Sequence, residues 1–280
     1  MTSLPRVSRV DWRNFGARIV SAAILASIAL WAVWVFDLGA WWRAPFITLV
    51  SLIAGWLCVE WARMIAPARP APIAAVSAIA VVAVVLLAFA GLWVAAWAAI
   101  GAGALAAALA AQRTTRVADA AYGVLYIAPA GLVTAWLRDS PQGRGWVLML
   151  FAATWAADVC AYVVGSTLRG PKLWPRFSPN KTWTGFIGGL LGAMAVCVAI
   201  PAAAVMRLAL AGAALIGLAG GLATMAGDLW ESMLKRRYGV KDSGDLIPGH
   251  GGLLDRVDGL MFAVMVFAFA RLFVKLRWAH

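Results

Sequence analysis

Nine long apolar runs limit what this chain can fold into. Each is close to the roughly 20 residues that a helix needs to cross the hydrocarbon core of a bilayer. Backbone polar groups in hydrocarbon must be paired within the protein, and these runs are too long and too uniformly apolar for barrel strands. We therefore predict an all-α, multipass integral membrane bundle. Its predicted spans are residues 18–36, 44–62, 73–89, 91–110, 121–137, 146–166, 184–206, 208–228 and 258–274. A count of eight or ten spans stays open, because nine spans put the basic residues near the C-terminus on the outer side.

The composition supports a membrane protein. Hydrophobic residues make up 64% of the 280 residues and charged residues only 13%, about half the charged share of an average soluble domain. Tryptophans gather near the ends of the predicted spans, as at Trp146 and Trp230, which is typical of anchors at the membrane interface.

The excess of basic residues has a pattern along the chain. A net charge of +12 is also found in nucleic-acid-binding proteins, but here the Lys and Arg residues concentrate in alternate connections. If the N-terminus is cytoplasmic, 17 of the 24 basic residues fall on the inner side and seven on the outer side. This is the positive-inside pattern. We therefore predict a cytoplasmic N-terminus and no nucleic-acid partner.

Acidic residues divide the chain into two regions. Six of the 12 lie within residues 228–258, together with five basic residues and His250. The first four spans have only Asp37 and Glu60 within or beside them. We therefore predict scaffold helices in residues 1–120 and a catalytic region in residues 121–280, with cytoplasmic loops at 167–183 and 229–256.

The acidic segment begins with a helical pattern. Four polar residues recur at helical spacing and share one face: Asp228, Glu231, Ser232 and Lys235. Because a carboxylate at a helix C-terminus opposes the macrodipole, we expect the helix to continue to about Tyr238, with Gly239 closing it. Taken alone, the pattern fits a solvated helix end with salt bridges equally well.

Two further carboxylates begin the last span. Asp255 and Asp258 are three residues apart and point the same way. Facing Asp228, they make an oxygen-only site suited to Mg²⁺, which binds through one or two carboxylates plus substrate phosphates. The glycines of residues 247–253 let backbone N–H groups approach an anion. His250 is a candidate general base or phosphate donor, and zinc is disfavoured because no second His or Cys lies nearby.

Two other elements are predicted to face the same side. Residues 178–185 lead directly into a helix, where hydroxyls and Lys181 favour an anion; simple N-capping by Ser178, Thr182 or Thr184 explains them equally well. Asp158 lies inside a predicted span. Burying an acid in the membrane costs free energy, so such a residue is a functional candidate by default. The alternative is a structural hydrogen bond to Tyr162, four residues later.

These residues resemble the signature of phosphatidate cytidylyltransferases, the CDP-diacylglycerol synthases. Every defined position of that signature is matched, in this order: Ser232-Met-Leu-Lys235-Arg236, Lys241-Asp242-Ser-Gly244, Ile247-Pro248-Gly-His250-Gly251-Gly252 and Asp255-Arg256-Val-Asp258. Residues 158–165 and 178–183 look like two further family elements. The chain departs from the family near Asn180 and Thr184, where members often carry another Lys and an acid.

The resemblance implies transfer of a cytidylyl group from CTP to phosphatidate for phospholipid biosynthesis in the cell (inner) membrane. It implies Mg²⁺ as cofactor, held by Asp228 and Asp255, and leaves a second cation and a homodimer open. The implied catalytic residues are Asp228, Asp255, Asp258, Lys235 and His250. The implied substrate-binding residues are Ser178, Lys181, Thr182, Ser232, Arg236, Lys241, Asp242, Gly251, Gly252, Arg256, Asp158 and Tyr162.

Two other functions stay open at this point. A membrane lipid kinase or phosphotransferase would use similar acids and cations, and would release a nucleoside diphosphate. A transporter of an anionic substrate, with Asp158 coupled to protons, would need no nucleotide turnover.

Overall fold

The fold is a bundle of membrane-length helices. The computed structural model describes residues 23–33, 44–112, 115–175, 178–203, 208–246 and 251–277. Within these ranges eight helices are long and apolar enough to cross a membrane. They are α2 (Ala44–Ile65), α3 (Ala71–Phe89), α4 (Trp93–Ala111), α5 (Val117–Asp139), α6 (Gly143–Leu168), α7 (Trp183–Ala203), α8 (Leu210–Arg237) and α9 (Leu254–Arg277).

A shorter apolar helix, Ala23–Val33, precedes them. It falls inside the first predicted span, whose remaining residues lie outside the described ranges. The predicted class, an all-α multipass bundle of about nine helices, is therefore confirmed. The cytoplasmic N-terminus stays a prediction.

The end of α8 follows the capping pattern predicted from the sequence. The helix continues to Arg237, and Gly239 has a φ of +72°. The Gly239 N–H donates to the Arg236 carbonyl at 3.2 Å, and the Val240 N–H donates to the Lys235 carbonyl at 2.9 Å. This pair of hydrogen bonds is a Schellman motif, which places the basic residues in the last turn of α8.

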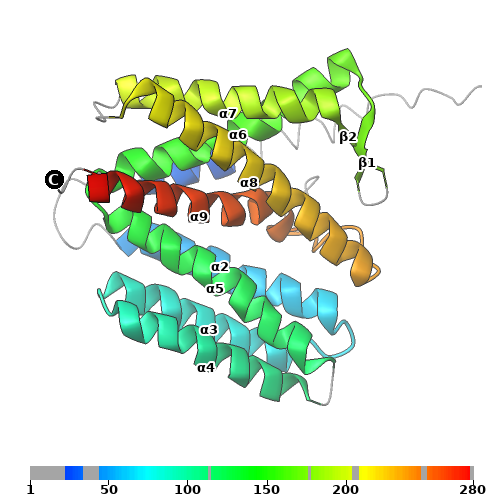
Figure 1. Ribbon diagram of the computed structural model, residues 1–280. Helices are drawn as coiled ribbons and strands as arrows, with labels where there is room; N and C mark the ends of the chain where they lie inside the picture. The colour runs from blue at the N-terminus through cyan, green and yellow to red at the C-terminus, as the bar shows by residue number, and fades with distance from the viewer. Residues whose placement is uncertain are drawn as a thin grey trace, which may run out of the picture.

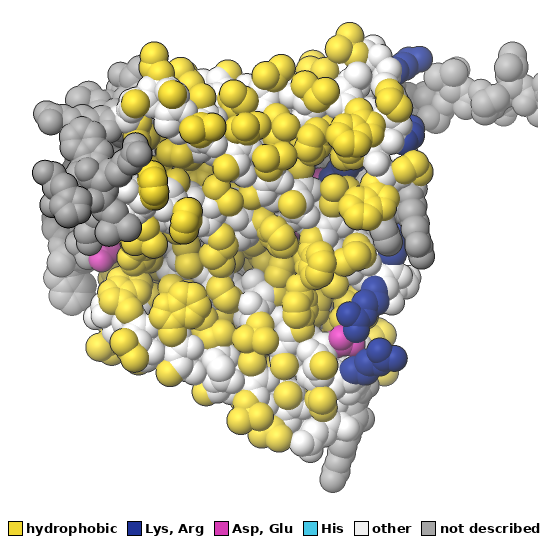
Figure 2. Space-filling model, in the orientation of Figure 1, with side chains coloured by type: hydrophobic (Ala, Val, Ile, Leu, Met, Phe, Trp, Pro, Cys, Tyr) yellow, Lys and Arg dark blue, Asp and Glu magenta, His cyan; other side chains and the backbone are white. Residues whose placement is uncertain are grey.

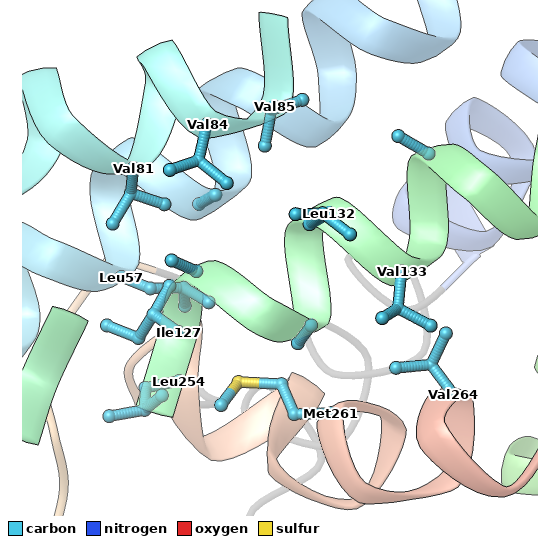
Figure 3. Packing of buried hydrophobic residues seen from close by; sticks show 14 of the residues in the cluster. Leu57, Val81, Val84, Val85, Ile127, Leu132, Val133, Leu254, Met261 and Val264 are labelled. Carbon is cyan, nitrogen blue, oxygen red and sulfur yellow. The ribbon is translucent and has the colours of Figure 1, made fainter. Parts of the chain in front are cut away.

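The helices form two groups that meet along α5 and α9. Helices α2 to α5 pack against one another in the first group, and α6 to α9 in the second. Figure 1 shows α3 and α4 at one edge of the molecule and α6 with α7 at the other. Figure 3 shows Val81, Val84 and Val85 of α3 on one side of α5, and Met261 and Val264 of α9 on the other.

Residues 172–182 hold an element that the sequence did not predict. Two short antiparallel strands, β1 (Lys172–Trp174) and β2 (Ser178–Thr182), pair Lys172 with Thr182 and Trp174 with Ser178. The second strand leads directly into α7, as expected of this segment. The hairpin projects beyond the helices at one end of the bundle (Figure 1).

The surface separates apolar and basic areas. Hydrophobic side chains cover most of the face in Figure 2, and Lys and Arg side chains gather at the end where the hairpin and the end of α8 lie.

The interfacial role predicted for Trp146 is wrong. Its side chain is 2% exposed and lies under the Arg271 guanidinium, 5.9 Å from it, so it packs inside the bundle. Trp230 is 37% exposed and donates to the Tyr122 hydroxyl at 2.8 Å.

Candidate active site

The candidate site forms where the backbones of α8 and α9 touch. A Cβ atom on Gly227 would lie 2.4 Å from the Asp258 carbonyl oxygen, and one on Gly259 would lie 2.7 Å from Thr224 Cγ2. Only glycine permits such an approach. Because Asp228 follows Gly227, the crossing brings the acidic parts of both helices together.

A cavity of about 1400 Å³ opens at this crossing. Its charged lining residues are Asp158, Asp228, Asp242, Asp255, Asp258, Lys181, Lys235 and Arg256. The helix Ala23–Val33 and helices α2, α5, α6 and α9 supply apolar lining. On α9 the acids come first and Met261 and Val264 follow one to two turns later. The cavity is therefore charged near the start of α9 and apolar further along it.

The first charged contact joins the hairpin to α8. Lys181 of β2 forms an ion pair with Asp228 through Nζ and Oδ2. The Ser232 hydroxyl lies 3.5 Å from the other oxygen of Asp228, Oδ1. The hairpin thus brings a lysine to the predicted metal ligand on α8.

The second charged contact joins α8 to α9. Lys235 Nζ lies 2.5 Å from Asp255 Oδ1 and 3.7 Å from Glu231 Oε1. With the Ser232–Asp228 contact, this confirms the helical face predicted for these four α8 residues. Asp255 Oδ2 accepts the backbone N–H groups of Ser243 and Gly252 at 3.0 and 2.9 Å. In this structure these two loop amides therefore bind a carboxylate of the protein itself.

Thr182 caps α7. Its Oγ1 accepts the Gly185 N–H at 3.2 Å and lies 3.1 Å from the Thr184 hydroxyl. N-capping, one of the two readings left open by the sequence, is confirmed for Thr182. Thr182 also lines the cavity, so its predicted role in substrate binding stays a prediction.

Asp158 lies on the cavity wall in α6, ten residues before the helix ends. Tyr162 lines the same cavity and is 75% exposed. Within the part of the chain that the structure describes, no hydrogen bond joins these two side chains. The structural alternative for Asp158, a bond to Tyr162, is therefore not found.

Several predicted site residues lie away from the cavity lining. Arg236 is exposed and donates to the Val240 carbonyl at 3.2 Å, Lys241 is exposed, and Ser178 pairs with Trp174 in the hairpin. Ser232, Gly251 and Gly252 border the lining through their contacts with Asp228 and Asp255. His250 lies outside the described residues.

The structure also adds an acid that the sequence assigned to scaffold. Glu60 of α2 is 1% exposed, and its carboxylate accepts the backbone N–H groups of Leu253 and Leu254 at 2.8 and 2.7 Å. The available signal was its position, since an acid within a membrane span is a functional candidate by default.

The donor set determines what kind of metal site the cavity suits. Among the described residues, no group of three or more His, Cys, Asp or Glu is arranged to hold a metal ion. Asp228 and Asp255 nevertheless line one cavity, and each has a lysine ammonium as counter-charge. Hard oxygen donors in this number fit Mg²⁺ when phosphate oxygens and water complete the coordination.

Comparisons with known proteins cover almost the whole chain. A profile of the Cytidylyltransferase family matches residues 16–274. The chain is 36% identical to a phosphatidate cytidylyltransferase of Brucella suis biovar 1 (strain 1330), over 94% of this chain and 95% of that protein. It is 39% identical to one of Pseudomonas aeruginosa, over 52% of this chain and 54% of that protein. These matches agree with the resemblance carried by the motifs, and the chain belongs to the cytidylyltransferase family.

Proposed function

We propose that this protein is a CTP:phosphatidate cytidylyltransferase of the cell (inner) membrane, which makes CDP-diacylglycerol and pyrophosphate. Family membership and the full-length relatives bear out the activity predicted from the motifs. One structural observation carries the proposal furthest. A single cavity inside a membrane bundle has charged groups at one part and apolar walls along the rest, as a lipid substrate and a triphosphate together require.

The apolar part of the cavity suits the lipid substrate. Apart from the short apolar helix Ala23–Val33, its walls come from helices that are long enough to cross a membrane, so acyl chains there stay in an apolar environment. The phosphatidate phosphate would then lie toward Arg256 and the two lysines. In this arrangement the reacting group is fixed and its chains need not leave the bilayer.

The charged part suits the triphosphate of CTP. Lys181 and Lys235 are each paired with a carboxylate, so a phosphate that binds either lysine necessarily lies next to Asp228 or Asp255. We propose that these two acids hold Mg²⁺. When bound, the ion offsets phosphate charge and polarises the α-phosphoryl group.

The chain's own residues position the substrates. An oxygen of the phosphatidate phosphate attacks the α-phosphorus of CTP, the bond from that phosphorus to the bridging oxygen breaks, and pyrophosphate leaves with the electron pair. No protein nucleophile is needed, because an ionised phosphate is already one. Lys181, Lys235 and Arg256 stabilise the charge that develops on the phosphoryl oxygens.

Asp158 of α6 lines the same cavity as the acids of α8 and α9. We propose that its carboxylate holds a cationic group between the lipid and nucleotide sites.

CTP is made in the cytoplasm, so the charged part of the cavity faces the cytoplasm in this proposal. The hairpin and the end of α8 lie on that side.

The activity test uses the purified full-length protein with phosphatidate, Mg²⁺ and one nucleoside triphosphate at a time, labelled at either the α- or the γ-phosphate. The proposal predicts a labelled lipid with α-labelled CTP and none with any γ-labelled nucleotide. Label transferred only from the γ position would identify a lipid kinase instead. Uptake of an anion without nucleotide consumption would identify a transporter.

A further inference from the structure

Glu60 is a buried acid of α2 with four hydrogen-bond donors around its carboxylate. Oε1 accepts the Leu253 N–H at 2.8 Å and the Trp56 indole N–H at 3.0 Å. Oε2 accepts the Leu254 N–H at 2.7 Å and the Ser243 hydroxyl at 3.2 Å. Three of the four donors belong to the segments that border the active site.

Two of these donors are at the beginning of α9. The first N–H groups of a helix have no partner within it, and a carboxylate at that end also offsets the helix dipole. Glu60 accepts these N–H groups and offsets the helix dipole, although it lies 193 residues before Leu253 in the sequence. The start of α9 is thus fixed from the half of the chain that contributes no predicted metal ligand.

The same segments hold Asp255. Ser243 donates its hydroxyl to Glu60 and its backbone N–H to Asp255 Oδ2. Gly252, next to Leu253, donates its backbone N–H to that same oxygen. The segments at 243 and 252–254 therefore lie between two carboxylates, and Lys235 bonds the far side of Asp255.

The packing leaves these segments little freedom. A Cβ atom on Gly252 would lie 2.0 Å from the Ser243 hydroxyl oxygen and 2.8 Å from Glu60 Oε2. One on Gly244 would lie 3.1 Å from Glu60 Oε1. A displacement of the Glu60 carboxylate would therefore move the donors of Asp255.

We propose that Glu60 is a positioning residue for cytidylyl transfer, which holds Asp255 in place through Ser243, Leu253 and Leu254. The inference rests on the proposed function, because Asp255 is a predicted ligand for the metal. A carboxylate is required because it accepts from all four donors, whereas the amide of Gln turns an N–H₂ group toward some of them.

The test compares Glu60→Gln with Asp119→Asn in the purified full-length protein. Asp119 is a matched control. It is 7% exposed and pairs with Arg237 at 2.9 Å, with no contact to the 243 and 252–254 segments among its described interactions. Glu60→Gln is expected to raise the Mg²⁺ concentration for half-maximal turnover about 10- to 100-fold, with the KM for phosphatidate unchanged. Asp119→Asn should keep the wild-type Mg²⁺ response.

Hydrogen–deuterium exchange without substrates or metal gives a second readout. Faster exchange at the Leu253 and Leu254 amides in Glu60→Gln, and not in Asp119→Asn, is the expected result. Wild-type exchange together with a wild-type Mg²⁺ response would overturn the inference, even if thermal stability falls. If Glu60→Gln does not fold, Ser243→Ala takes its place, because it removes one donor to Glu60. It should raise the Mg²⁺ requirement and speed exchange at Leu253 and Leu254, both by less than Glu60→Gln. No change in either measurement would reject the proposal.

Failure of the proposed function gives a different result. A wild-type protein that makes no CTP-dependent lipid product would reject that function. The exchange comparison would still show whether Glu60 orders the start of α9.

Discussion

Helix pairs α3–α4 and α8–α9 use the same packing device with different results. In both pairs a glycine allows close contact: a Cβ on Gly103 would lie 2.6 Å from the Ala80 Cβ, and one on Gly227 would lie 2.4 Å from the Asp258 carbonyl oxygen. Neither α3 nor α4 contains a charged residue. In α8 and α9 acids stand next to the crossing, so close packing there also brings charges together. Small residues at a crossing set the distance between helices, and the neighbouring side chains decide whether a site results.

The largest effect is expected from the two predicted metal ligands. Asp228→Asn and Asp255→Asn keep the size of the side chain and remove its charge, so turnover should fall by about a thousandfold or more while the protein still inserts. Activity of purified variants at a fixed Mg²⁺ concentration measures this. Asp245→Asn, an exposed acid of the same segment, is the control and should stay close to wild type. Near-normal turnover in Asp255→Asn would remove the catalytic role from the α8–α9 crossing.

Asp158 tests whether the site extends from that crossing to α6. Asp158→Asn should lower turnover by about a hundredfold or more with little change in the thermal midpoint, because no hydrogen bond to Tyr162 would be lost. Turnover and thermal unfolding are measured on the same preparation. A fully active variant would reduce Asp158 to a packing residue and limit the site to α8, α9 and the hairpin.

Glycine-to-alanine substitutions compare a glycine at the close contact between α8 and α9 with a glycine whose added Cβ would meet open space. Gly227→Ala forces α8 and α9 apart at the Asp258 carbonyl and should cost about 1–3 kcal/mol of stability, with a loss of turnover as the acids separate. Gly101→Ala in α4 meets no heavy atom within 4 Å and should stabilise the helix by up to about 1 kcal/mol. Thermal unfolding in detergent, together with turnover, measures both. Equal tolerance at the two positions would contradict the account of the crossing.

Cysteine labelling tests on which side of the membrane the charged end of the cavity lies. Asp245→Cys, in a background without Cys58, Cys160 and Cys197, puts a thiol at an exposed position of the 241–246 segment. It should react with an impermeant reagent only after the inner face becomes accessible. Reaction from outside in intact cells would invert the proposed topology and separate the site from cytoplasmic CTP.

The sequence predicted the features of the fold that neighbouring residues encode, and it missed others. Apolar length located the helices within a few residues, and the Schellman end of α8 followed from Gly239 and the charges before it, because both signals lie in adjacent residues. The β1–β2 hairpin was not predicted, since its strands have three and five residues and β2 contains a proline.

The partners of the site residues were also beyond the sequence. The motifs named Asp228 and Asp255, but the pairing of Lys181 with Asp228 depends on where the hairpin places Lys181 relative to α8. The contacts of Glu60 depend on packing between α2 and α9, far apart in sequence. Such contacts have no local signal in a single chain.

The measurement that tests the central claim most directly follows both phosphates into the product. Purified protein is given CTP and phosphatidate that carry different phosphorus isotopes at the α-phosphate and the lipid phosphate, and the lipid fraction and pyrophosphate are quantified. If the cavity joins the two substrates as proposed, the product lipid contains both isotopes in equal amounts and is matched by an equal amount of pyrophosphate. A lipid product with only one isotope, or pyrophosphate released without any lipid product, would contradict the account.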